Sequence, residues 1–310
     1  GLFEITNATS GTALLVGVNN NATATPFLID GGTVNLSALL DIKGHASPVI
    51  LYQGTLNCFG NSRMSEVGND RDGRIEVNGG VANIGSYSVA KSRSTGGFIV
   101  NGGVVNATGL QIGYWNSQCY ATINGGFVTN TGPFTINDRV NAATTGERRV
   151  RFLIRGGTVV STDAAGIIVA NQANAAVGGS AAVLGGILDI NAGTLIAEGI
   201  TLVKDNTLTN AHANLILAGT GSIYLGSVGL NGNVGPINSS YSIAMSGGTL
   251  GAHNNFAING NITLTGTAAT FRAADPAGNP FGITANGVIS SSGVLTKTGG
   301  GILTLNNNNT

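Results

Sequence analysis

The 310-residue chain has few charged and few aromatic side chains. Charged residues make up 9% of the sequence and aromatic residues 5%, with one Trp and two Cys. Soluble domains carry roughly a quarter charged residues, so an ordinary helical protein, whose exposed faces need Lys, Glu and Arg, is excluded. The 14 basic and 14 acidic side chains cancel to a net charge of zero. This balance offers no charged surface for nucleic acid or for an anionic membrane.

Long apolar runs are also missing. The least charged stretch, residues 164–188, contains Asn171, Gln172, Asn174 and two glycine pairs, so it is predicted to form strands and turns and not a membrane-spanning helix. The first ten residues, GLFEITNATS, lack the charged segment of a signal peptide. We therefore expect no membrane insertion, no nucleic-acid partner and no signal peptide within this sequence.

The chain is rich instead in glycine, asparagine and threonine. It has 50 Gly, 36 Asn and 32 Thr, and 42% of its residues are hydrophobic. Glycine and asparagine favour turns, while threonine, valine and isoleucine favour strands. The hydrophobic residues are spread evenly and suffice for a core, which argues against disorder. The composition indicates an all-β protein with many turns.

Glycine-containing corners recur along the sequence, with 22 to 33 residues between the second glycines of neighbouring corners. They are Gly31–Gly32, Gln53–Gly54, Gly79–Gly80, Gly102–Gly103, Gly125–Gly126, Gly156–Gly157, Gly185–Gly186, Ala218–Gly219 and Gly247–Gly248. Such a period is typical of one coil of a β-solenoid. We predict about twelve coils that form a single continuous domain over residues 1–310.

The apolar pattern changes phase at each corner. In the third coil the inward-facing residues are Ile75 and Val77 before the glycines and Ala82 after them. A straight strand keeps alternate residues on one side, so the strand must bend between Val77 and Ala82. Glycine tolerates the positive φ of such a bend. Each coil is therefore predicted to be a strand, a glycine corner, a second strand and a variable loop.

Amide side chains occupy equivalent positions in successive coils. Three residues after the second glycine stand Asn35, Asn57, Asn83 and Asn106, followed by Thr129. One residue before the corner stand Asp30, Gln53, Asn78, Asn101 and Asn124. Equivalent positions of a parallel solenoid lie about 4.8 Å apart, so these amides are predicted to form hydrogen-bonded ladders along the axis.

Residues 292–310, SGVLTKTGGGILTLNNNNT, resemble the autotransporter-associated β-strand repeat of bacterial secreted and surface proteins. Its pattern, G-x-L-x-K-x-G-x-G-x-L-x-L, is met by Gly293, Leu295, Lys297, Gly299, Gly301, Leu303 and Leu305, with Thr310 at the end of the repeat. The resemblance covers about eighteen residues. It implies a right-handed parallel β-helix located outside the cell or on the bacterial cell surface.

Parallel β-helices include polysaccharide lyases and hydrolases, whose active sites stack two or three carboxylates on one face. The carboxylates of this chain are not in register with one another. They include Asp41, Asp163, Asp189, Asp205 and Asp275. We therefore predict no catalytic residues and no enzyme activity, with a carbohydrate-active β-helix as the alternative.

The metal-binding patterns are incomplete. The turn Asn69–Asp70–Arg71–Asp72–Gly73 lacks the alternating acidic series and the distal Glu of a calcium loop. His45, His212 and His253 lie in different coils without the spacing of metal ligands. We predict a solvated loop, histidines that are either structural or simply exposed, and neither a metal nor a cofactor.

Two further features receive structural interpretations. In the basic run from Glu147 to Arg155, Arg151 and Arg155 are predicted to face outward and Phe152 and Ile154 inward, because neighbouring side chains in a strand point to opposite sides. Cys58 and Cys119 are about two and a half coils apart, too far for a disulfide. Each is predicted to be a buried thiol, with a bond between subunits as the alternative.

Together these features favour a structural, non-enzymatic β-solenoid. The strands at residues 2–5 and 302–305 lie near the two ends of the sequence, and such strands have edges that invite pairing. The chain is therefore expected to be the subunit of an extracellular filament joined end to end, or the rod of an adhesin-like passenger. A module that binds surface glycans remains an alternative, for which Tyr114, Trp115 and Tyr120 are the candidate aromatic platform.

Overall fold

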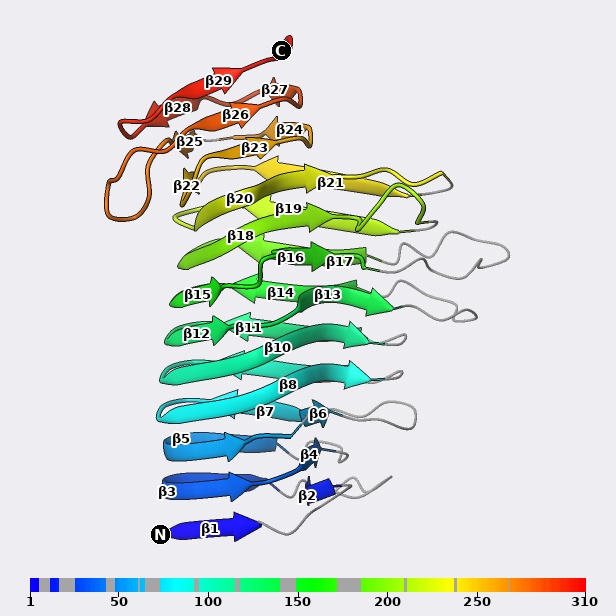
Figure 1. Ribbon diagram of the computed structural model, residues 1–310, viewed down its shortest axis with the longest axis vertical. Coiled ribbons are helices and arrows are strands. Elements are labelled where there is room, and N and C mark those ends of the chain that lie inside the picture. The colour runs from blue at the N-terminus through cyan, green and yellow to red at the C-terminus, as the bar shows by residue number, and fades with distance from the viewer. Residues whose placement is uncertain are drawn as a thin grey trace.

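The computed structural model describes residues 1–5, 12–16, 26–42, 48–60, 62–64, 73–91, 95–114, 118–139, 149–171, 185–208, 211–236, 239–266 and 268–310. These residues contain 29 strands and no helix. All strand pairings in the stack are parallel, and the coils rise from β1 to β29 as one column (Figure 1). The predicted all-β parallel solenoid is confirmed.

The strands form three faces. Face 1 follows the glycine corners and contains β1 (Leu2–Ile5), β3 (Phe27–Leu36), β5 (Pro48–Cys58), β8 (Val81–Lys91), β10 (Val104–Tyr114), β12 (Phe127–Asn130), β15 (Thr158–Ser161), β18 (Thr194–Leu202), β20 (Ser222–Gly232), β22 (Thr249–Ala252), β25 (Ala269–Arg272) and β28 (Leu295–Thr298). Several of these strands are long enough to continue round a corner into a neighbouring face.

Face 2 comes next along each coil. It contains β2 (Thr12–Val16), β4 (Leu39–Ile42), β6 (Ser62–Met64), β13 (Phe134–Arg139), β16 (Ile167–Val169), β23 (Phe256–Ile258), β26 (Ile283–Ala285) and β29 (Leu303–Leu305), with the second halves of β8, β10, β18 and β20.

Face 3 leads back to the next corner. It contains β7 (Arg74–Val77), β9 (Thr95–Val100), β11 (Gln118–Ile123), β14 (Arg149–Ile154), β17 (Gly185–Ile190), β19 (His212–Leu217), β21 (Ser240–Met245), β24 (Ile262–Leu264) and β27 (Ile289–Ser291), with the first halves of β3 and β5.

Eleven parallel pairings join the strands of face 1 from β1 to β28. The number of complete coils among the described residues therefore differs slightly from the predicted twelve. Coil length also varies more than expected: Thr158 and its partner Thr194 are 36 residues apart, whereas Thr249 and Thr270 are 21 apart. Loops of different length are accommodated because only the strands have to remain in register.

The change of phase at the corners is confirmed. Ile75, Val77 and Ala82 are all buried, although Ala82 lies five positions, an odd number, after Val77. The inward columns form one continuous core, whose largest fully buried side chains include Tyr87 and Phe98. Each buried aliphatic or aromatic side chain of this kind stabilises the fold by about 1.5–3 kcal/mol.

One predicted corner is wrong. Gly185 and Gly186 lie inside β17, paired with Arg149 and Val150, and the corner falls at residues 191–193, where Gly193 has a φ of 77°. A Cβ on Gly186 would lie 2.7 Å from Val169 Cγ1. This glycine pair therefore serves close packing within the core, and the sequence alone does not distinguish that role from a turn.

The true corners bring backbones of neighbouring coils into contact. Gly126 has a φ of 75°, and a Cβ on it would lie 2.6 Å from the carbonyl oxygen of Gly103 in the preceding coil. A side chain is excluded there twice, by the backbone conformation and by the coil beneath. Gly266 has nearly the same φ, 79°, but a Cβ on it would meet no atom within 4 Å.

Gly266 and Gly126 separate the cost of a left-handed backbone from the cost of a collision with the neighbouring coil. Gly266→Ala is expected to lower the free energy of unfolding by about 1–2 kcal/mol, the cost of a left-handed non-glycine residue. Gly126→Ala adds the collision with the next coil and is expected to cost about 4 kcal/mol or more. Urea unfolding of both variants measures the difference, and equal losses would show that coil contact at the corner is unimportant.

Candidate functional site

The outer surface of face 1 carries the predicted amide ladder. Asn57 Nδ2 donates to Asn35 Oδ1 at 2.7 Å, and the same bond recurs from Asn83 to Asn57 at 2.7 Å and from Asn106 to Asn83 at 2.8 Å. Thr129 Oγ1 donates to Asn106 Oδ1 at 2.7 Å. The first amide, Asn35, donates to the Glu4 carboxylate at 2.8 Å. The prediction is confirmed in every step.

The ladder uses only part of the hydrogen-bonding capacity of its amides. An asparagine side chain has two N–H donors and two acceptor lone pairs. Asn83 and Asn106 each use one donor and one lone pair along the ladder. Each amide therefore keeps one donor and one lone pair, repeated at the strand spacing of about 4.8 Å.

The second predicted ladder is interrupted. Gln53 donates to Asp30, and Asn124 and Asn101 donate to Asn101 and Asn78, each at 2.7–2.8 Å. The interruption lies at the corner where β3 pairs with β5. There the register moves from the Ile29–Leu51 pair to the Asp30–Gln53 pair, so β5 contains one extra residue, Tyr52. Gln53 is thereby displaced from the column, and Asn78 donates to the Glu76 carboxylate at 3.2 Å.

A third ladder was not predicted. Asn259, Asn286 and Asn306 each donate to the amide of the preceding coil, at 2.7, 2.9 and 2.9 Å, beginning from Asn231. These residues follow strands of face 2, where no glycine pair marks the position. Their spacing of 28, 27 and 20 residues is a signal that a search on asparagine alone could have found.

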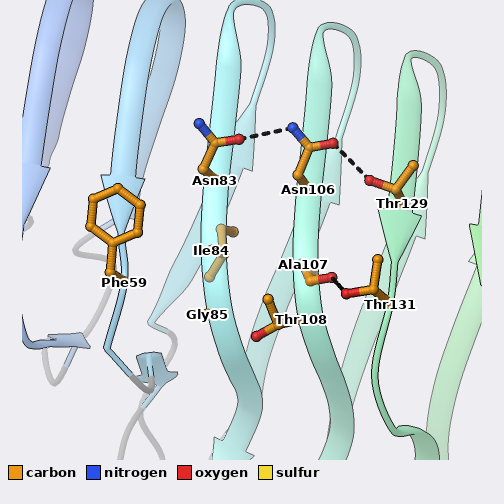
Figure 2. Close-up of a pocket in the computed structure, with 9 residues that line it drawn as sticks. All are labelled: Phe59, Asn83, Ile84, Gly85, Asn106, Ala107, Thr108, Thr129 and Thr131. Carbon is orange, nitrogen blue, oxygen red and sulfur yellow. Dashed lines mark hydrogen bonds between the residues drawn. The ribbon is translucent and has the colours of Figure 1, made fainter. Parts of the chain in front are cut away.

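A groove of about 340 Å³ opens beside the first ladder, where face 1 bends into face 2. We call it the Phe59 groove. It is lined by Phe59, Asn83, Ile84, Gly85, Asn106, Ala107, Thr108, Thr129 and Thr131. Figure 2 shows these residues on neighbouring strands, with the phenyl ring of Phe59 at one end and the ladder amides along one side.

The hollow arises because the bend is occupied by small residues. The β8–β10 register pairs Ile84 with Ala107 and then resumes at Ser86 with Gly109, so the strands bend at residues 85 and 108. A Cβ on Gly85 would lie 2.5 Å from Gly60 O and 3.2 Å from Phe59 O. Glycine is therefore required at this bend, and its missing side chain leaves the space beside Phe59 open.

Phe59 is the aromatic residue that the sequence interpretation missed. Its side chain is 70% exposed, the most of any aromatic residue among those described. The signal was present, because Cys58 is an inward position of β5 and its successor must face outward. The predicted platform is only partly described: Tyr120 is exposed and its ring lies against Gly97, whereas Trp115 and the side chain of Tyr114 lie outside the described part.

The predicted scatter of the carboxylates agrees with their positions. Arg155 donates two hydrogen bonds to Asp189, of 2.9 and 2.7 Å. Hydrogen bonding to this carboxylate raises the pKa of the arginine. Asp41 is buried in β4, in register with Leu15 and Arg63. Asp163 accepts a hydrogen bond from the N–H of Ala165 within its own turn.

Two further carboxylates stabilise turns. The Thr207 hydroxyl and then its N–H donate to Asp205, and they lower the pKa of that carboxyl. The side-chain amide of Asn279 does the same for Asp275. Within the described residues, no group of three His, Cys, Asp or Glu side chains is placed to hold a metal ion.

The basic run has the predicted orientation where it is described. Arg151 and Arg155 are exposed, and Phe152 and Ile154 are buried. Residues 147–148, most of the acidic turn at 69–73 and His45 lie outside the described residues. His253 is exposed at a corner, and the ring Nδ1 of half-buried His212 lies 2.8 Å from Ser240 Oγ.

The two cysteines are buried thiols that are not joined in a disulfide. Cys58 Sγ donates to the carbonyl oxygen of Ala38 at 3.6 Å. Both thiols lie near the fully buried phenol of Tyr87, whose pKa is raised mainly by burial and further by Cys58 and Cys119. The cluster belongs to the core, which confirms the structural interpretation of both cysteines.

Comparison with protein-family models, with curated proteins and with solved structures finds no match to this chain. The resemblance of residues 292–310 to the autotransporter-associated repeat therefore stays a prediction. The described residues contain no helix that is long and apolar enough to cross a membrane.

The ladder makes a specific prediction for Asn57. In Asn57→Asp, the new carboxylate still accepts from Asn83 but opposes the oxygen of Asn35, so the free energy of unfolding at neutral pH is expected to fall by about 1–3 kcal/mol. Asn254→Asp is the control, because Asn254 Oδ1 only accepts a hydrogen bond from the N–H of Asn255. Equal urea midpoints for the two variants would contradict a stabilising ladder.

The partial burial of the His212 imidazole makes the stability of the folded chain depend on pH. Burial lowers its pKa in the folded chain, so as the pH falls below about 6.5 the unfolded chain takes up the proton first. The stability present above that pH is lost as the pH falls toward the folded pKa. His212→Gln is expected to lose less stability than the wild type between about pH 7.5 and about pH 5, as measured by urea unfolding. His253→Gln, at an exposed site, is the control for replacing a histidine by glutamine.

Proposed function

We propose that this chain is a non-enzymatic structural β-solenoid of a bacterial extracellular or cell-surface assembly. It serves either as the subunit of a filament joined end to end or as the rod of an adhesin-like passenger. The observation that carries the proposal is that inward positions of the first and last coils, Phe3 and Leu305, are exposed, whereas their partners in the neighbouring coils are buried. The inward columns are completed when another coil covers them.

At the first coil, Phe3 occupies an inward column. Its side chain is 45% exposed, whereas Val34, its partner in the next coil, is 7% exposed. Gly1 O and Ile5 O accept hydrogen bonds from Thr33 and Ser37. Because alternate residues of a parallel strand bond to opposite neighbours, the backbone groups of Leu2 and Glu4 point away from β3. They form an edge that can pair with another strand.

The last coil presents the opposite edge. Leu305 is 44% exposed, whereas its partner Ala285 is 1% exposed. Lys297 occupies the column of buried Phe271, and its ammonium donates to Gly299 O at 2.7 Å. The lysine stem covers the ring below while its charge stays in water.

The two edges are compatible. Continuing the register of face 1 from β28 places Phe3 of a second copy over Lys297, and Glu4 of that copy over Thr298. A lysine beneath an aromatic ring supplies a cation–π contact. An inward lysine also disfavours pairing with strands that offer only aliphatic residues. The junction therefore favours a second copy of the chain over unrelated strand edges.

The location follows from the same proposal. The autotransporter-associated repeat, which residues 292–310 resemble, occurs in secreted and surface proteins of bacteria. A surface rich in Asn and Thr and poor in charge remains solvated through neutral hydrogen-bonding groups. The two thiols of the chain are buried in the core.

Blocking the first edge tests the filament version. Leu2→Pro removes an N–H that points away from β3, so the fold should remain intact while end-to-end association weakens by at least about tenfold. Sedimentation velocity over a range of concentrations measures the average mass of the wild-type chain and of Leu2→Pro. Electron microscopy shows whether the rods lengthen.

Leu2→Ala is the matched control, since it removes the side chain and keeps the N–H. It should associate more strongly than Leu2→Pro. A wild-type chain that remains monomeric at every concentration would rule out the filament version, in which the covering coil comes from a second copy. Association that is unchanged in Leu2→Pro would show that the β1 edge is not the junction.

A further inference from the structure

We propose that the Phe59 groove binds a neutral, extended oligosaccharide, which lies along the solenoid axis with one sugar ring against Phe59. This site is on the side of the solenoid, away from both end coils, and does not depend on the proposed end-to-end association. Three properties of the groove support it: an exposed aromatic ring, a row of unused hydrogen-bonding groups and the absence of charge.

The aromatic ring provides the apolar contact that a sugar requires. One face of a pyranose ring presents only C–H groups, and these pack against the negative face of an aromatic ring. Phe59 is 70% exposed, and the next coil places Gly85 beside it with no side chain. The ring is therefore accessible from the groove (Figure 2).

The polar side of the groove matches sugar hydroxyls. Asn83 and Asn106 each retain one N–H donor and one lone pair beyond their ladder bonds. The exposed Thr108 hydroxyl makes no hydrogen bond to any described residue. A hydroxyl both donates and accepts, so neighbouring sugar hydroxyls can bond to a donor and an acceptor of one amide.

The repeat of the groove favours a chain of sugars over a single small molecule. Its residues come from β5, β8, β10 and β12 or the turns that follow them, and these strands are consecutive in face 1. Three strand steps span about 14 Å. A volume of 340 Å³ lies at the small end of ligand pockets, which range over about 300–1,000 Å³, so the groove accommodates a short stretch of an extended glycan.

Charge and backbone pairing exclude other polymers. None of the nine lining residues is charged, so acidic polysaccharides and nucleic acids find no counter-charge. The strands of face 1 at the groove pair with neighbours on both sides. A peptide therefore has no open strand edge to extend there.

Isothermal titration calorimetry of the whole chain tests the proposal with three neutral, extended β-1,4-linked probes: cellotetraose, mannotetraose and tetra-N-acetylchitotetraose. At least one is expected to bind. Phe59→Ala is expected to raise its dissociation constant about tenfold, and Thr108→Val, which replaces only the hydroxyl, severalfold. Both side chains are exposed, so thermal unfolding should be close to that of the wild type.

Phe127→Ala is the matched control, because Phe127 is also an exposed phenylalanine of face 1 but does not line the groove. It should leave binding unchanged. The proposal fails if none of the three probes binds at millimolar concentration or if the two Phe→Ala variants weaken binding equally. It also fails if tetragalacturonic acid or the curved maltotetraose binds as tightly as the best probe.

Discussion

The structure depends on one constraint: each coil must lie a single strand spacing from the previous coil along its strands and at the glycine corners. The strands meet it through parallel hydrogen bonds, and the corners meet it only where no side chain intervenes. A Cβ on Gly157 would lie 2.5 Å from Gly126 O, and one on Gly126 would lie 2.6 Å from Gly103 O. The glycine column thus allows the backbones of neighbouring coils to come into contact at the corners. The side-chain columns inside and outside the solenoid are consequences of that contact.

The same constraint produces the surface features that bear on function. Because equivalent positions repeat at a fixed spacing, outward asparagines become ladders that use one donor and one lone pair of each amide and leave the others unused. Where the strands bend at Gly85, the lack of a side chain opens the Phe59 groove beside the ladder. At the two end coils the columns are uncovered, and Phe3 and Leu305 are exposed at positions that are buried elsewhere.

Much of this arrangement could be predicted because the pattern repeats. The first ladder, from Asn35 to Thr129, and the phase change between Val77 and Ala82 follow from spacing alone. The errors occur where one coil departs from its neighbours. Tyr52 inserts an extra residue and breaks the second ladder, and Gly186 is small because Val169 packs against it and not because the chain turns. Phe59 was missed because only its neighbours across the bend make it part of a groove.

The sequence by itself determined the fold class, most of the glycine corners, the inward columns and the first ladder, because each depends on a residue's own conformational preference and on strict alternation along a strand. Only the tertiary structure decided the exact register, the groove and the uncovered end columns, since these depend on contacts between residues 20 to 36 positions apart. Val203 illustrates the difference. It adopts a φ of 59°, against the preference of a β-branched residue, in the corner column that Asn137 and Ala170 occupy with the same left-handed backbone. Stacking on the coils beneath outweighs local preference there.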